Sequence, residues 1–465
     1  MGLVALADFG STYTKVSLVD PEEGRLVARA EAPTSIGSDL MEGYAAALAA
    51  AVSAAGEPAP IDEQLAASSA GGGLRVAAVG LVAELTATAA RQTALNAGAR
   101  VGCVLAGALD AAKLEELEEA RPEIVLFAGG TDGGQAELVL ENARRLAAHG
   151  LDAAVVVACN AEIAGKASEI LGEGGALVEV AGNVMPSLGR IEVESARAAI
   201  LRLFLEHVIG GKGLSASPEF GRMVRMPTPE AVYEATRLLA SGSATEDGVG
   251  EVVVIDVGGA TTDVHSHRSV EAASPGIEDP LLPPPATLRT VEGDLGLRAG
   301  AEGAYAVDRD WIASGSGLDE AAIRHAVSER ARNPGWIPGA PEEARLDGLL
   351  AISCAAQAVR RHCGTMLLTR GEGGPPTLRR DGADLREVGL VLGTGGVFAH
   401  RDDGGRILEQ ALERRAPRSL APQEPRPAVD SNYVLAAAGV LASVDRDGAW
   451  RLLKRNLLAS ENKTK

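Results

Sequence analysis

The chain has 465 residues, of which 46% are apolar and 23% charged, and its 44 basic and 63 acidic side chains give a formal charge of −19. This length supports two or more domains with their own cores. The acidic balance argues against non-specific binding of nucleic acid or anionic membranes, which needs a basic surface. None of the four cysteines forms a Cys-x-x-Cys pair, so neither a zinc ribbon nor a disulfide framework is expected.

The N-terminal segment is predicted to form three strands and a helix. Residues 3–7 are an apolar run that ends in a turn of small residues, and the runs 13–19 and 25–30 are separated by an acidic turn. Residues 39–55 have a helical pattern that Gly56 closes.

Apolar runs and helical patterns then alternate from about residue 74 to residue 181. Because each run is apolar throughout, these strands are expected to be buried on both faces, as in a parallel sheet covered by helices. The sequence therefore predicts a doubly wound α/β unit. Its expected strands are 76–79, 101–105, 124–127, 153–157 and 176–180, and its expected helices are 85–97, 109–120, 135–148 and 161–171.

The second half of the chain begins with another predicted strand pair, 251–257 and 261–267, after helices at 192–208 and 229–241. Two Pro-rich segments are expected to be surface connections rather than regular elements. These segments are 274–286 and 416–428, and the other expected elements are helices at 318–332, 342–362, 431–441 and 449–458 and a strand at 388–392.

Hydropathy predicts neither a secretion signal nor a membrane span. No basic segment precedes the apolar first residues, and Asp8 interrupts them. The longest apolar stretch, 432–444, is shorter than the roughly 20 residues that a membrane helix needs. A reducing cytoplasm is the expected location.

Two related segments, 8–15 and 256–263, carry the strongest chemical signal. Each has an Asp at the end of an apolar strand, a Gly two residues later, and hydroxyl residues before the next strand. Asp8 and Asp256 lie 248 residues apart, which indicates an internal duplication. Either segment alone would also fit a hairpin turn rich in small residues.

This pattern suits phosphate binding between two strands. Gly lets backbone N–H groups approach phosphate oxygens closely, hydroxyl groups add donors, and Lys15 can bring a positive charge to the phosphates. Asp8 and Asp256 can hold a hydrated Mg²⁺, which prefers carboxylate oxygens and water. The expected phosphate contacts are Gly10, Ser11, Thr12, Lys15, Gly258, Gly259, Thr261 and Thr262.

A third glycine-rich turn follows the strand expected near residue 390. There a helix N-terminus and bare backbone can face a nucleotide. The expected contacts are Gly393, Gly395 and Gly396. Taken alone, this turn would equally fit a strand–helix connection.

Together the three turns resemble those of the sugar kinase, heat-shock-protein-70 and actin superfamily of ATPases. The resemblance implies an α/β fold of two ribonuclease-H-like lobes, with an inserted α/β unit in the first half and with ATP and Mg²⁺ as cofactors. It implies a first lobe over 1–245, with the first phosphate loop and the insert, and a second lobe over 246–465, with the second phosphate loop and the adenosine loop.

Further segments look like the glutamate mutase-associated MutL family, and this resemblance covers essentially the whole chain. It implies an ATP-binding ATPase that acts as an accessory or reactivating chaperone for an adenosylcobalamin-dependent glutamate (methylaspartate) mutase. The mutase subunits would be its partners, with no nucleic acid or membrane. The segments are 68–72, 95–99, 126–134, 183–186, 292–298 and 430–433.

Two acidic residues are candidates for positioning the attacking water. Asp132 lies in the glycine-rich loop 129–134, between a predicted strand and helix, and can hold water in line for the γ-phosphate. Glu162 ends segment 157–162, which resembles the first connecting motif of the superfamily, where an acid or amide orients water. A turn dictated by packing is the alternative for the first loop.

Several other polar residues are expected to lie on the surface or to have structural roles. Glu292 and Asp294 are expected in a solvated loop, and His265 and His267 as a surface pair. The segment that begins at Asp263 lacks the Gly of the cobalamin-binding Asp-x-His-x-x-Gly pattern, so no cobalamin is expected on a His of this chain. Cys354, His362 and Cys363 are expected as two buried thiols and a histidine at a helix end.

Three other functions would use similar motifs. A small-molecule kinase needs a base near an acceptor hydroxyl, and no clear sugar-site signature accompanies the turns. An electron-transferring activator of acyl-CoA dehydratases has a similar first loop, but no Cys here follows a Gly-rich pattern suited to its iron–sulfur cluster. An assembly scaffold that binds nucleotide without turnover is the remaining alternative.

Overall fold

Two five-stranded sheets with the same topology form the frame of the molecule. The computed structural model describes residues 2–56, 60–211, 213–269, 277–370 and 376–458. The strand orders are β10-β4-β1-β2-β3 and β14-β12-β11-β17-β18. The strands are β1 Leu3–Phe9, β2 Tyr13–Asp20, β3 Arg25–Pro33, β4 Ile61–Ser68 and β10 Val224–Met226, and β11 Val252–Val257, β12 Thr262–His267, β14 Thr287–Glu292, β17 Leu390–Thr394 and β18 Arg426–Val429.

In each sheet the strand that comes first in the chain lies at the centre. The second and third strands continue antiparallel on one side, and the fourth and fifth continue parallel on the other. This is the topology of a ribonuclease-H-like lobe, present twice. The predicted fold class is therefore confirmed, and the repeated strand order supports the internal duplication.

The central strand β1 shows why these segments are apolar throughout. Leu3, Ala5 and Ala7 pack into the hydrophobic cluster on one face of the first sheet. Val4 and Leu6 pack into a second cluster on the opposite face. Since both faces are buried, the strand has no polar side for an alternating pattern to reveal.

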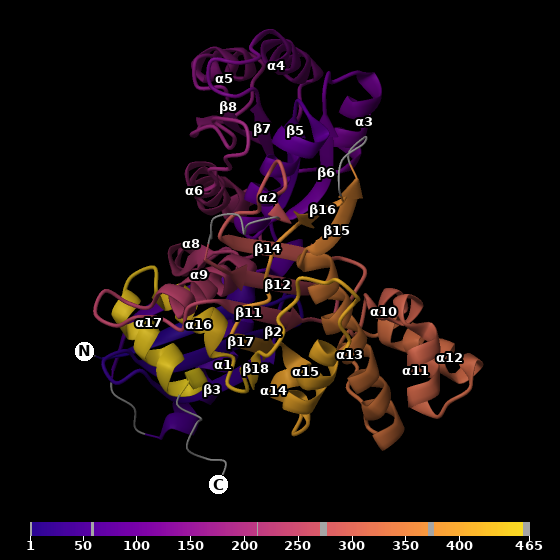
Figure 1. The fold of residues 1–465 in the computed structure, drawn as a ribbon. Coiled ribbons are helices and arrows are strands. Elements are labelled where there is room, and N and C mark those ends of the chain that lie inside the picture. The colour runs from indigo at the N-terminus through magenta and orange to yellow at the C-terminus, as the bar shows by residue number, and fades with distance from the viewer. Residues whose placement is uncertain (1, 57–59, 212, 270–276, 371–375, 459–465) are drawn as a thin grey trace.

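The predicted doubly wound unit is confirmed as a parallel sheet inserted between β4 and β10, with the order β6-β5-β7-β8-β9. Helices α2 and α6 pack on the face shared with the first sheet's core, and α3, α4 and α5 cover the other face. Figure 1 shows this insert at one end of the molecule. Its elements are β5 Arg75–Gly80, α2 Thr88–Asn96, β6 Arg100–Ala106, α3 Ala111–Glu119, β7 Ile124–Gly129, α4 Glu137–His149, β8 Ala154–Cys159, α5 Ala164–Glu173, β9 Val178–Val180 and α6 Glu194–Leu203.

Helices α9 Thr228–Ser241 and α16 Val434–Leu441 pack together between the two large sheets. Their hydrophobic cluster contains Leu6 of the first sheet and Val254 of the second. The crossing is close, because a Cβ on Gly439 would collide with the carbonyl oxygen of Ala231. The last helix, α17 Arg446–Leu453, joins the same core. Helix α17 therefore brings the chain back to the first sheet.

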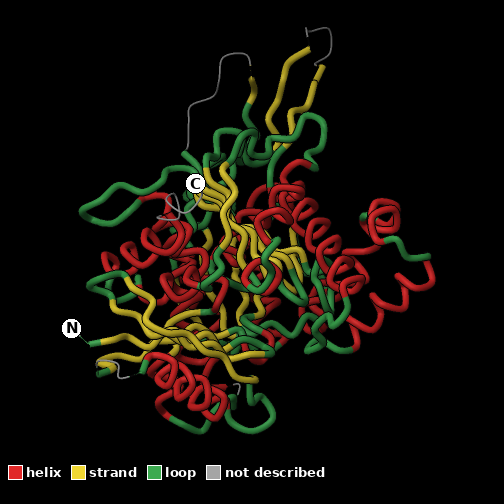
Figure 2. The backbone as a smooth tube through the Cα atoms, turned by 90° about the horizontal axis from the view of Figure 1, so that it is seen from below, coloured by secondary structure: helices red, strands yellow, loops and turns green. Residues whose placement is uncertain are grey.

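Further helices surround the two large sheets. A fourth, three-stranded sheet of order β13-β16-β15 extends beyond the body of the molecule (Figure 2). No helix in the described ranges is long and apolar enough to cross a membrane. The remaining elements are α1 Leu40–Ala55, the short turns Ala70–Gly72 and Ala83–Ala87, a π-helical turn Phe204–Val208, α7 Ile209–Gly211, α8 Pro218–Met223, α10 Ala301–Val307, α11 Arg309–Ser316, α12 Glu320–Arg332, α13 Pro341–His362, α14 Gly396–Ala399, α15 Gly404–Glu413, the turn Lys454–Leu458, β13 Ile277–Glu278, β15 Thr365–Arg370 and β16 Pro376–Asp381.

The expectation that both Pro-rich segments are connections is partly wrong. Ile277–Glu278 forms the short strand β13, whereas residues 274–276 lie outside the described residues. The second segment runs into β18, which includes Pro427 at the edge of its sheet. An edge strand tolerates Pro because one side of its backbone needs no ladder partner.

Candidate nucleotide site between the two sheets

The first two glycine-rich turns occupy equivalent places in the two sheets. Each connects the central strand with its antiparallel neighbour. The Gly10 amide donates to the Tyr13 carbonyl at 3.2 Å, and the Gly258 amide donates to the Thr261 carbonyl at 3.0 Å. A Cβ would lie 2.7 Å from that carbonyl oxygen at Gly10 and 3.0 Å from it at Gly258. Both tight turns therefore favour glycine for the same steric reason.

The predicted hydroxyl contacts differ in their accessibility. Ser11 and Thr12 are exposed in the first turn, and Thr261 is half-buried in the second. Thr262 is fully buried, and its hydroxyl donates to the Leu295 carbonyl at 3.0 Å. The Thr262 hydroxyl is thus engaged inside the protein rather than presented by the turn.

The third turn lies beside the second because β17 is the parallel neighbour of β11. Gly395 has φ 103°, and a Cβ there would lie 2.9 Å from the Asp256 carboxylate. Gly393 and Gly396 flank this position at the end of β17 and the start of α14. The structure thus brings the predicted adenosine turn against the predicted metal ligand Asp256.

The carboxylates of the two sheets share one electrostatic environment. Burial, the neighbouring Asp263 and, to a smaller extent, Asp8 together raise the pKa of Asp256 to about 7 against the opposing charge of Lys15. Lys15 Nζ lies 3.8 Å from one Asp8 oxygen, and the Thr228 hydroxyl donates to the other at 2.6 Å. In the described part of the chain, no side-chain hydrogen bond or ion pair engages the Asp256 carboxylate. Asp256 is thus a half-buried carboxylate without a donor, beside other acids.

The segment after β14 binds the second turn through backbone hydrogen bonds. The Leu297 amide donates to the Gly258 carbonyl at 3.0 Å, and the Arg298 amide donates to the Gly259 carbonyl at 2.6 Å. Asp294 lies in an exposed loop, as expected, whereas Glu292 is the last residue of β14. Both carboxylates accept from the Arg361 guanidinium at 2.7 Å. This motif therefore has a structural role beside the turn.

Asp132 and Glu162 lie together, but at the carboxyl edge of the insert. Asp132 accepts from the Ala161 amide at 2.9 Å and from the Asn183 side chain at 2.8 Å. Among the described residues, no hydrogen bond or ion pair joins either acid to the phosphate turns. The role of Asp132 or Glu162 in positioning water stays a prediction.

The interpretation of segment 157–162 as the motif that connects the lobes is wrong. Residues 157–159 belong to β8, inside the inserted sheet. The element that leaves the first sheet for the second is α9, which follows the fifth strand β10. Its first residue, Thr228, is the one that bonds Asp8. Sequence reasoning missed Thr228, although the flanking Pro227 and Pro229 are a helix-start signal.

Other residues near the turns were also missed or misjudged. His265 is fully buried, and neither of its ring nitrogens has a hydrogen-bond partner among the described residues. Burial holds the pKa of His265 well below the ordinary value. The expected surface location of His265 is therefore wrong, because β12 is covered on both faces. Cys354 and Cys363 are buried as predicted, and His362 ends α13. Asp430 is fully buried and caps α16 through the amides of Val434 and Leu435.

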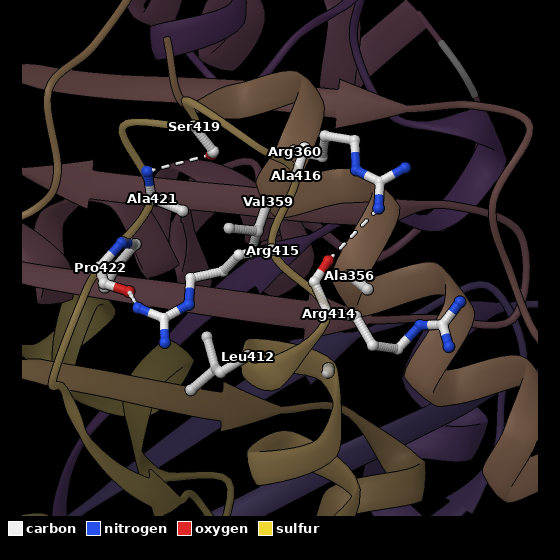
Figure 3. A pocket seen from close by; sticks show the side chains of 11 residues that line it. Ala356, Val359, Arg360, Leu412, Arg414, Arg415, Ala416, Ser419, Ala421 and Pro422 are labelled. Atoms are coloured by element: carbon white, nitrogen blue, oxygen red, sulfur yellow. Dashed lines mark hydrogen bonds between the residues drawn. The ribbon is translucent and has the colours of Figure 1, made fainter. Parts of the chain in front are cut away.

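A separate hollow of about 270 Å³ lies between α13 and α15, lined by residues such as Val359, Arg360, Leu412 and Arg415. Figure 3 shows the Arg360 guanidinium directed to the Arg414 carbonyl and the Arg415 guanidinium directed to Pro422. None of the predicted site residues lines it. Within the described residues, no group of three or more His, Cys, Asp and Glu is arranged to hold a metal. A metal between the sheets would thus depend on Asp8, Asp256 and ligands from outside the protein.

Comparison with known proteins gives a match over nearly the whole chain. The family described as MutL protein matches residues 4–457. Protein MutL of Clostridium tetanomorphum is 38% identical over 467 residues, which span 98% of this chain and all of that protein.

Solved structures are more distant. A glycerol dehydratase reactivase shares 13% identity over 95% of this chain and 99% of its own, with a TM-score of 0.34. The activator of the 2-hydroxyisocaproyl-CoA dehydratase from Clostridium difficile, with bound ADPNP, shares 10% identity over 97% of each chain, with a TM-score of 0.31.

Proposed function

The chain belongs to the MutL protein family, and from this premise we propose that it binds ATP with Mg²⁺ between its two large sheets. We further propose that it acts as an accessory, reactivating protein for an adenosylcobalamin-dependent glutamate (methylaspartate) mutase. The observation that carries the nucleotide site is the pair of matching Asp–Gly turns at equivalent strand ends, with the third turn against Asp256.

In the proposed nucleotide site, the first two turns would bind the phosphates and the third would contact the nucleoside. Backbone amides of 10–12 and 258–259 would donate to the phosphates, Lys15 would add a charge-assisted contact, and Gly393, Gly395 and Gly396 would let the nucleoside approach the backbone. Helix α14 is too short to contribute more than its first amides.

The carboxylates suit a divalent cation. Asp256 has no hydrogen-bond donor among the described residues and faces Asp8 and Asp263, which raise its pKa. A cation held by Asp8 and Asp256 would relieve this repulsion and would neutralise phosphate charge when bound.

Calorimetric titration with ATP in the presence of Mg²⁺ tests the nucleotide site. We expect Asp8→Asn and Asp256→Asn to lose the Mg²⁺-dependent part of the affinity, because each removes a charged ligand. Asp152→Asn is the matched control, since Asp152 is an exposed Asp of the insert. Wild-type affinity and Mg²⁺ dependence in both site variants would refute the assignment.

We propose the insert as the surface that contacts the mutase. A buried ion pair supports a coupling between the position of the insert and the nucleotide turns. Arg289 of β14 donates to Asp263 at 2.6 and 3.0 Å. The same guanidinium donates to the Leu95 and Ala99 carbonyls at the end of α2, at 2.6 and 3.0 Å. Asp263 also accepts from Thr261 of the second turn at 3.2 Å. A nucleotide that moves this turn would therefore bias the position of the insert.

A reactivation assay tests the partner. Mutase loaded with inactive hydroxocobalamin is mixed with this protein, ATP and fresh adenosylcobalamin, and mutase activity is followed. We expect recovery only with ATP and with wild-type protein, and none with Asp256→Asn. Flat activity, together with no nucleotide-dependent complex on a sizing column, would remove the reactivating role.

One observation favours a second candidate, a scaffold that binds nucleotide without turnover. Among the described residues, no hydrogen bond or ion pair joins Asp132 or Glu162, the two water-positioning candidates, to the phosphate turns. Measuring the ATP turnover rate beside the ATP dissociation constant separates the two functions. Tight binding without turnover would favour the scaffold.

A further inference from the structure

Tyr433, the residue before α16, lies over two cations of the first sheet. Lys15 Nζ is 4.4 Å from the centre of the Tyr433 ring, and Arg29 Cζ is 4.2 Å from it. Lys15 lies on β2 and Arg29 on the adjacent β3, and they share one face because Lys15 pairs with Glu31, two residues from Arg29. The Tyr433 ring, which is distant in the sequence, thus contacts two cations of the first sheet, and one of them, Lys15, is the expected phosphate ligand.

The ring is held in place from the second sheet. Tyr433 has φ 51° and ψ 38°, a left-handed conformation that is uncommon for a residue with a side chain. The buried Asp430, three residues earlier, fixes the start of α16 by accepting from the amides of Val434 and Leu435 at 2.9 and 3.0 Å. The Tyr433 hydroxyl is 3.5 Å from where a Cβ on Gly396 would stand. Tyr433 therefore bridges the third turn and Lys15.

Apart from the Tyr433 ring, the Asp8 carboxylate is the one partner of the Lys15 ammonium among the described residues. Its ion pair with Asp8 is long, at 3.8 Å, and both side chains are partly exposed, at 26% and 18%. Such a pair restrains a flexible lysine weakly. A cation over an aromatic face contributes a further attraction that survives partial exposure.

We propose that Tyr433 is a positioning residue for Lys15. By a cation–π contact, its ring holds the Lys15 ammonium beside the first phosphate turn before the nucleotide binds, so that less side-chain freedom is lost on binding. The alternative is that Tyr433 only shapes the start of α16. This inference rests on the proposed nucleotide binding for its effect on affinity, but the contact itself can be tested without nucleotide.

Lysine labelling in the nucleotide-free protein tests the contact. The full chain is treated with an amine-acylating reagent, and modification of each lysine is followed by mass spectrometry. We expect Tyr433→Leu to raise the labelling rate of Lys15 about threefold or more, because the ring no longer restrains it. Tyr433→Phe should leave that rate unchanged, and the exposed Lys166 serves as internal control. Equal Lys15 rates in wild type and Tyr433→Leu would overturn the proposal.

A double-mutant cycle tests the consequence for affinity. ATP dissociation constants are measured for wild type, Tyr433→Leu, Lys15→Met and the double variant, with Tyr433→Phe as the conservative change. We expect Tyr433→Leu to weaken binding about three- to tenfold in the wild-type background and to have almost no effect when Lys15 is already Met. Tyr433→Phe should bind within about twofold of wild type, since the ring remains.

The outcomes separate this inference from the proposed function. Loss of affinity by the same factor in both Lys15 backgrounds would show a merely structural role, and so would failure of Tyr433→Phe to restore binding. If wild type binds no ATP, the proposed function and the role in nucleotide affinity fail together, whereas the labelling experiment still decides whether Tyr433 positions Lys15. If wild type binds ATP and Tyr433→Leu binds equally well, only the inference about Tyr433 fails.

Discussion

Replacing Asp256 by Asn should stabilise the nucleotide-free protein at alkaline pH while it removes Mg²⁺-dependent nucleotide binding. Burial and the neighbouring Asp263 raise the pKa of Asp256 from 3.8 to about 7 in the folded chain. The folded chain therefore binds more protons than the unfolded chain between about pH 4 and pH 7, and the free energy of unfolding falls as the pH rises through this range. Asn cannot ionise, so the variant escapes this loss.

The magnitude follows from the shift. About three pKa units at roughly 1.4 kcal/mol each give about 4 kcal/mol above pH 7, and less where water reaches the half-buried carboxylate. The same linkage gives about 2 kcal/mol at pH 5, so the advantage of the variant should grow by about 2 kcal/mol between pH 5 and pH 8.

Urea unfolding at pH 5, 6.5 and 8 measures this difference. Wild type, Asp256→Asn and the control Asp152→Asn are compared without nucleotide and then with Mg²⁺ and ATP. We expect the stability advantage of Asp256→Asn at pH 8 to shrink on adding Mg²⁺ and ATP, because wild type gains the Mg²⁺-dependent part of the binding energy and the variant does not. An Asp256→Asn variant whose stability difference does not change with pH would refute the reasoning.

The remaining predictions concern packing, the buried ion pair and the insert. Gly439→Ala should lower the free energy of unfolding by about 1–3 kcal/mol, because the new Cβ meets a backbone carbonyl of α9. The control Gly165→Ala, whose Cβ stands in open space on α5, should not destabilise the chain. Equal stability of the two variants would contradict the close crossing of α9 and α16. Arg289→Met should lower the free energy of unfolding, measured with urea, by about 3–5 kcal/mol, because it leaves Asp263 buried without its partner. Adding Asp263→Asn should restore part of that stability. Strictly additive effects of the two changes would mean that the residues do not interact. Asp132→Asn and Glu162→Gln test the two candidates for positioning water. The variant that binds ATP normally but loses turnover would identify the water-positioning residue, and unchanged turnover in both would exclude the two candidates.

Local signals were enough for much of the fold. The central strands of the insert, β5, β7 and β8, could be predicted because both of their faces are buried and they are therefore apolar almost throughout. The edge strands β6 and β9 are partly exposed, contrary to the expectation that every strand of this unit is buried on both faces. The equivalence of Gly10 and Gly258 could be predicted because both turns must close on a carbonyl three residues later. In both cases the sequence constraint is contained within a few neighbouring residues.

Contacts between distant segments were beyond local patterns. Strand β10 has three residues, too few for a periodicity, and it owes its place to pairing with β4. Thr228 meets Asp8, and Tyr433 meets Lys15, only because α9 and α16 cross between the sheets. His265 and His267, two polar residues on one face of a predicted strand, suggested a surface pair. The sequence pattern does not show that helices pack against β12 and bury His265.

The central claim is that a nucleotide binds between the two matching turns, and a crystal structure with Mg²⁺ and a non-hydrolysable ATP analogue tests it most directly. We expect phosphate oxygens within hydrogen-bonding distance of the backbone amides at Gly10 and Gly258, with the metal between Asp8 and Asp256 and the adenosine beside Gly395. An analogue bound elsewhere, for example at the insert loop 129–134, with the two turns empty, would contradict the account.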